Sequence, residues 1–113
     1  MAQGMLIVQA EPVATAEADF NVWYDDVHLS EVLATPGFVR ARRYRTLRSP
    51  AETRDRESGW GRYIAVYEIE GRDPLEAHAA LLARVRAGEL TTSDTVAAES
   101  YRSQLYEMIA KRP

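Results

Sequence analysis

The chain of 113 residues contains no cysteine, only two histidines and no long hydrophobic run. The lack of cysteine excludes disulfides, thiolate metal sites and cysteine nucleophiles. No segment approaches the roughly 20 apolar residues that span a bilayer. The short apolar run at residues 5–8 is not preceded by the basic residues of a signal peptide. We therefore expect a cytoplasmic protein that does not associate with membranes.

The chain also lacks a large excess of charge of either sign, because its formal net charge is only −3 and its pI is near 5.4. Such a balance gives no general attraction to nucleic acid or to an anionic membrane. A glycine-rich phosphate loop, a G-x-S-x-G elbow, a zinc-protease helix and redox cofactor motifs are all missing. The sequence predicts no nucleic-acid partner and no cofactor.

The residues that are present predict one folded domain, residues 1–113, with elements in the order βαββαβ. Short apolar or alternating runs predict strands at residues 5–11, 38–45, 63–69 and 105–109. Apolar residues three and four positions apart predict a helix over residues 16–34. A second helix is expected to begin at Asp73 and end at Gly88. Two helices on one face of a four-stranded antiparallel sheet make a ferredoxin-like α+β domain.

The second face of such a sheet is not covered by helices. It carries aliphatic and aromatic residues from several strands, and a monomer rarely exposes such a surface to water. We therefore expect a homodimer in which two sheets pack face to face.

Residues 20–44, FNVWYDDVHLSEVLATPGFVRARRY, carry a more specific pattern. They combine a helical W-Y-x-x-x-H-L motif, a P-G-F turn and an arginine-containing strand: Trp23, Tyr24, His28, Leu29, Pro36, Gly37, Phe38, Arg42, Arg43 and Tyr44. The stretch resembles the signature of the EthD-like family in the dimeric α/β-barrel superfamily, except that Ser30 stands where the family often has proline. The resemblance implies a ferredoxin-like protomer, a barrel-forming dimer and pockets between sheet and helices. The superfamily includes cofactor-free monooxygenases, polyketide cyclases and a muconolactone isomerase, so the resemblance does not select a reaction.

His28 is the first candidate for catalysis, because its unperturbed pKa lies nearest neutrality. On an α-helix, Tyr24 and Asp25 emerge on adjoining parts of the same face as His28. Asp25 is then able to orient the imidazole, and Tyr24 to donate to a developing oxyanion. This set suits acid/base catalysis of cyclisation, isomerisation or oxygenation of a hydrophobic, oxygenated metabolite, polyketide-like or aromatic. All three residues also suit a structural role, so a non-catalytic binding or accessory protein is the alternative.

Three aromatic residues are candidates for substrate binding: Trp23 on the first helix, and Tyr63 and Tyr67 on the third strand. Each of them equally suits the core. The polar stretch at residues 46–62, which contains Trp60, is interpreted either as a lid or as a hairpin connection.

Arginines follow both faces of the second strand. Alternation places Phe38, Arg40 and Arg42 on one face, and Arg43 and Arg45 on the other. Any one of these arginines is a candidate for binding a ligand carboxylate, and Arg42 is the one that we select, although charged residues on a strand also serve to block edge pairing.

His78 shares one predicted face of the second helix with Leu75, Leu82 and Val85. We expect this face to pack on the sheet, which makes His78 a candidate either for the core or for ligand contact. His28 and Glu31 have metal-compatible spacing, but no third ligand is suggested, so no metal site is expected.

Overall fold

A computed structural model of the chain describes residues 3–47 and 61–113. Four strands form one antiparallel sheet in the order β2-β3-β1-β4. They are β1 (Gly4–Gln9), β2 (Phe38–Arg45), β3 (Tyr63–Ile69) and β4 (Arg102–Glu107). The expected βαββαβ order and ferredoxin-like α+β fold are confirmed. The last strand begins earlier than predicted, because Arg102 already pairs with Gln9 of β1.

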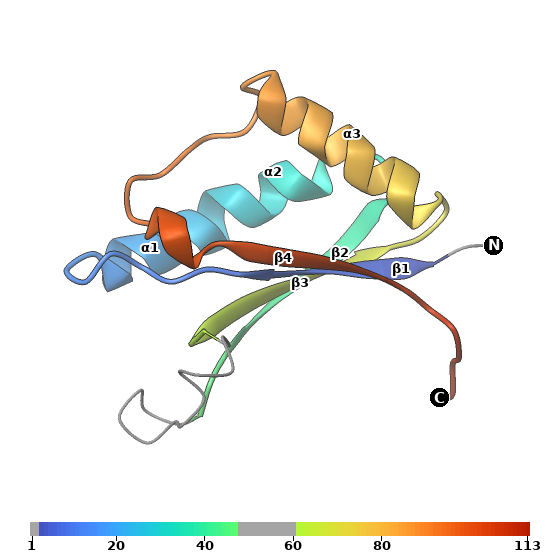
Figure 1. The fold of residues 1–113 in the computed structure, drawn as a ribbon, viewed down its shortest axis with the longest axis horizontal. Helices are drawn as coiled ribbons and strands as arrows, with labels where there is room; N and C mark the ends of the chain where they lie inside the picture. The colour runs from blue at the N-terminus through green and yellow to red at the C-terminus, as the bar shows by residue number, and fades with distance from the viewer. Residues whose placement is uncertain (1–2, 48–60) are drawn as a thin grey trace.

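The helices form a layer over one face of the sheet (Figure 1). They are α1 (Glu17–Trp23), the π-helix η1 (Tyr24–His28), α2 (Leu29–Leu33), α3 (Pro74–Arg86) and the short 3₁₀-helix η3 (Ala98–Ser100). The segments α1, η1 and α2 follow one another directly; α2 contacts β2, whereas α3 contacts β1 and β4. None of the described helices is long and apolar enough to cross a lipid bilayer.

The core lies between the sheet and this helical layer. Alternate residues of the central strands point toward the helices, and these are the buried ones. On β1 they include Leu6 and Val8, and on β3 they include Tyr67 and Ile69. Phe20 of α1 is buried against them. The helix-covered face of β3 therefore belongs to the core, and Tyr67 points from the sheet toward the helices.

The first helical segment is not the continuous α-helix that was predicted for residues 16–34. The backbone N–H of Leu29 bonds to the carbonyl of Tyr24, five residues earlier, so η1 is a π turn. Single π turns inside α-helices occur frequently at functional sites. A wider turn keeps residues four apart on nearly the same face but separates residues three apart. Tyr24 and His28 therefore stay together, whereas Asp25 turns away from His28.

A β-bulge changes the predicted faces of β2. The register between β2 and β3 shifts between Phe38 and Arg40. A bulge adds one residue to the strand and so reverses the alternation beyond it. Phe38 is buried beneath the helices, but Arg42 pairs with Val66 on the uncovered face. The prediction that Phe38 and Arg42 share a face is wrong, and Arg43 takes the helix-covered side.

The predicted packing face of α3 is also wrong. Pro74, Ala77 and Leu81 are buried, whereas Leu75 is 73% exposed and Val85 is 52% exposed. The small residues explain this orientation. A Cβ built on Gly37 would lie 3.1 Å from the Cβ of Ala77, so helix and turn approach closely on that side. The start of the helix is as expected, because the Asp73 carboxylate accepts a hydrogen bond from the Leu75 N–H at 2.8 Å.

Candidate functional site

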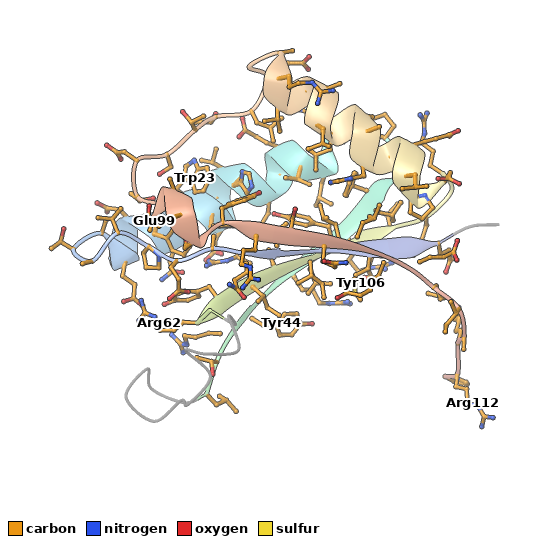
Figure 2. All side chains as sticks on the ribbon, viewed as in Figure 1. Trp23, Tyr44, Arg62, Glu99, Tyr106 and Arg112 are labelled. Atoms are coloured by element: carbon orange, nitrogen blue, oxygen red, sulfur yellow. The ribbon has the colours of Figure 1, made fainter. Side chains whose placement is uncertain are left out.

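Three of the predicted residues meet on the inner side of the first helical segment. The His28 ring stacks on Trp23, with centroids 4.7 Å apart and an angle of 24° between the planes. The Tyr24 ring meets His28 edge-on at 4.9 Å. The π turn brings Tyr24 and His28 to one face, and Trp23 precedes it directly. Figure 2 shows Trp23 on the helix-covered side of the sheet.

Tyr67 of β3 completes this group from the side of the sheet, and we call Trp23, Tyr24, His28 and Tyr67 the aromatic–histidine cluster. Burial raises the pKa of Tyr24 and of Tyr67 far above the usual value for tyrosine. The interaction between the two hydroxyls lowers the pKa of Tyr24 and raises that of Tyr67. Tyr101, just before β4, raises both pKa values further. The two hydroxyls therefore lie near one another and stay protonated at neutral pH.

The cluster is unusual in its hydrogen bonding. Within the described part of the chain, four of its buried polar atoms have no partner: Trp23 Nε1, the Tyr24 hydroxyl, His28 Nδ1 and the Tyr67 hydroxyl. Buried polar groups in folded proteins are nearly always paired. An unpaired one costs about 1–3 kcal/mol of stability. Four such atoms in one cluster offer hydrogen bonds to a ligand with oxygen atoms.

His28 carries no positive charge near neutral pH. Burial lowers its pKa, and the nearby charge of Glu31 opposes that effect only in part. The expected hydrogen bond between Asp25 and a ring nitrogen of His28 is not formed, and Nδ1 of His28 has no partner among the described residues. Asp25 is 57% exposed and accepts a hydrogen bond from Arg43 instead. His28 is thus a neutral imidazole with a ring nitrogen available to bond.

Arg43 is the residue near this cluster that the sequence analysis did not select. Its guanidinium donates to Asp25 at 2.7 Å and to Asn21 at 2.9 Å. The central carbon of the guanidinium lies 4.6 Å from the centre of the Tyr24 ring, and 5.4 Å from that of Tyr63. Only 12% of the Arg43 side chain is exposed. The alternation along β2 separates Arg43 from Arg42, but only the bulge shows which of them faces the helices.

The structure does not bring the other predicted binding residues into the cluster. Arg42 lies on the uncovered face and pairs with Glu68 at 3.1 Å. The Tyr63 hydroxyl is already engaged, because it donates to Glu17. His78 lies half-buried on α3 and is not part of the aromatic–histidine cluster. Most of the polar stretch that was considered as a lid, including Trp60, lies outside the described residues.

The residues that the structure describes include no set of side chains that could bind a metal ion. No group of three or more histidine, aspartate or glutamate side chains lies close enough together to hold an ion.

Comparison with solved structures finds the same fold in an EthD family protein from Bacillus halodurans C-125. That protein is 13% identical and matches with a TM-score of 0.52 over 96% of this chain and 100% of its own. The chain has the fold of an EthD family protein. HapK from Hahella chejuensis also matches, with 19% identity and a TM-score of 0.48 over 100% of this chain and 97% of HapK. No family model and no curated protein matches the sequence. The likeness to the EthD family protein confirms the ferredoxin-like fold that the sequence resemblance implied.

Proposed function

We propose that the aromatic–histidine cluster binds a small, hydrophobic, oxygenated metabolite and that His28 transfers a proton on it without a cofactor. The observation that carries this proposal is the group of four buried polar atoms without partners. A ligand oxygen placed between the Tyr24 and Tyr67 hydroxyls would give both donors an acceptor. The rings of Trp23 and His28 offer an apolar surface for the rest of an aromatic ligand.

The protonation states assign a role to each group. Neutral His28 accepts a proton at Nδ1 from a C–H bond next to a ligand carbonyl. The electron pair of that bond moves onto the carbonyl oxygen, where the protonated Tyr24 and Tyr67 donate hydrogen bonds to the developing oxyanion. Return of the proton from His28 to another position of the same ligand completes an isomerisation or prepares a cyclisation. In this scheme Asp25 holds Arg43 and does not orient the imidazole.

Proton exchange on 1-tetralone, an aromatic ketone, tests this proposal directly. The protein should accelerate exchange of the α-hydrogens for deuterium, followed by proton NMR in D₂O. We expect His28→Gln to abolish the acceleration and Tyr67→Phe to reduce it about tenfold or more. His78→Gln is the matched control, because it removes the other histidine of the chain and should leave exchange unchanged.

The two candidate functions give different results in this experiment. Equal exchange rates for His28→Gln and wild type would refute the catalytic role of His28. If 1-tetralone binds, but no variant or wild type accelerates exchange, the result favours a non-catalytic binding or accessory protein. That alternative has one structural argument: His28 lacks the carboxylate partner that usually orients a catalytic imidazole.

The uncovered face of the sheet supports a second part of the proposal, a homodimer. Register places Met5, Ile7, Ile64 and Val66 on this face, at the centre of the sheet. Tyr44 and Tyr106 lie on the same side, away from the helices, as Figure 2 shows, and both are about half exposed. The ion pairs of Glu68 with Arg40 and Arg42 lie beside these residues on the same face. The apolar and aromatic residues at the centre of the face favour its burial against a second copy of the chain.

A further inference from the structure

Arg43 places a positive charge against the cluster without belonging to it. The Arg43 side chain is largely buried, and its guanidinium donates hydrogen bonds to the carboxylate of Asp25 and to the amide oxygen of Asn21. These two hydrogen bonds come from the same helical segment that carries Tyr24. The guanidinium is therefore fixed relative to the Tyr24 ring, and its charge acts on the cluster from a defined position.

The contact of Arg43 with Tyr24 is through the ring and not through the hydroxyl. A cation at 4.6 Å from the ring centre lies within the range of cation–π contacts. Positive charge at the ring withdraws electron density from the phenol, and the pKa values agree with this, because Arg43 opposes the burial that raises them in Tyr24 and Tyr67. A phenol polarised in this way is a stronger hydrogen-bond donor to an anionic oxygen.

We propose that Arg43 makes the site selective for the oxyanionic form of its ligand, a phenolate or an enolate, and that it acts through Tyr24 as a positioning residue. This inference rests on the proposed function and names the substrate class of that site. A neutral carbonyl gains little from a buried positive charge, whereas an oxyanion gains a large electrostatic stabilisation in a site of low dielectric.

The other charged or titratable groups around the cluster are few. Glu31 on α2 acts on His28 from the neighbouring helix. Tyr101 acts on the two tyrosine hydroxyls from the start of β4, and burial raises its own pKa. Asp25 partly neutralises Arg43 from the rim. Among these groups, only His28 is expected to change charge near neutral pH.

Absorbance titration of bound 4-nitrophenol measures this effect, because the phenolate of this probe absorbs in the visible range and the phenol does not. Bound to wild type, the probe should ionise at a lower pH than the free probe in the same buffer. Arg43→Met should raise the ionisation midpoint by about one pH unit, because it removes a nearby positive charge that Asp25 neutralises in part. Arg42→Met is the matched control, since Arg42 lies on the opposite face and should leave the midpoint unchanged.

Two further variants keep the test decisive if Arg43→Met folds poorly. Asp25→Asn removes a negative charge at an exposed side chain and keeps Arg43, so it should lower the midpoint, opposite to Arg43→Met. Arg43→Lys retains the charge and should restore most of the wild-type midpoint. A purely structural role of Arg43 would not shift the midpoint in opposite directions. Repeating the titrations with His28→Gln removes the one neighbour that titrates in this range.

The outcomes separate this inference from the proposed function. One outcome would refute the role of Arg43 alone. In that outcome the probe binds and Tyr67→Phe weakens its binding, but Arg43→Met and Asp25→Asn give the same ionisation midpoint as Arg42→Met. Arg43 would then not stabilise the oxyanionic form of the ligand. If 4-nitrophenol does not bind to wild type at all, the ligand site itself is refuted and this inference is refuted with it.

Discussion

Replacing Tyr67 by phenylalanine should stabilise the protein, although it removes a residue of the candidate site. The Tyr67 hydroxyl is buried and makes no hydrogen bond of normal geometry with the described residues, although the Tyr24 hydroxyl lies near it. Its removal recovers a desolvation cost of about 1–3 kcal/mol. It also gives up a few van der Waals contacts at about 0.1–0.2 kcal/mol each. The net expectation is a free energy of unfolding higher by about 1 kcal/mol, or a Tm higher by about 4 °C for a chain of this length.

Tyr63→Phe is the matched control in this comparison. Tyr63 lies on the same strand and the same face as Tyr67, but its hydroxyl donates to the Glu17 carboxylate and accepts from Asn21. Removing that hydroxyl breaks existing bonds and should lower the free energy of unfolding. Urea denaturation followed by circular dichroism, at one pH and one protein concentration, measures both variants. If Tyr67→Phe destabilises the protein as much as Tyr63→Phe does, the Tyr67 hydroxyl is satisfied in the folded state and the argument for a ligand site fails.

Three other predictions test different parts of the structure. The pKa of His28 is lowered on folding, so protonation of His28 favours the unfolded state. Wild type should therefore lose stability as the pH falls below about 6.5, by at most about 1.4 kcal/mol per pH unit, and His28→Gln should lose less over the same range in urea denaturation. Gly37→Ala should cost about 1–2 kcal/mol, because φ is +99° and a Cβ meets Ala77 at 3.1 Å, whereas Gly88→Ala, with φ +74° and open space, should cost less. Sedimentation at micromolar concentration should show a dimer that Val66→Glu dissociates, and a wild-type monomer would contradict the proposed interface.

Most of the fold could be predicted from the sequence, because its elements have strong local signals. Alternation along residues 63–69 predicted β3 with its bounds unchanged. The Asp73-Pro74 start predicted the first turn of α3. The face of α3 could not be predicted in the same way. Apolar residues lie on two adjoining sides of that helix, and the side that packs is decided by how closely Pro74 and Ala77 let it approach the sheet.

The candidate site was predicted in part, and two of the errors have one physical origin. Spacing of four residues brought Tyr24 and His28 together whether the turn was α or π. The partnership of Asp25 with His28 depended on a regular α-helix, and the π turn removed it. The predicted faces of the strand depended on regular alternation, and the β-bulge placed Arg43, not Arg42, on the same face as Phe38. Both of these errors lie where the backbone departs from a regular repeat, which periodicity alone does not reveal. The Tyr63 hydroxyl was excluded for another reason, its hydrogen bond to Glu17.

The two sides of the first helical segment differ in their hydrogen bonding. We call the side with Asn21 and Asp25 its rim. At the rim, Asn21 and Asp25 hold Arg43 with two short hydrogen bonds. On the inner side, the polar atoms of Trp23, Tyr24 and His28 have no such partners in the described structure. The same helical segment thus pairs its polar groups on one side and leaves them unpaired on the other. Irregular backbone and unpaired groups persist where the surrounding structure holds them, and they gather at functional sites. The π turn and the unpaired atoms coincide here, which is the strongest reason to seek the ligand at this helix before any other part of the described chain.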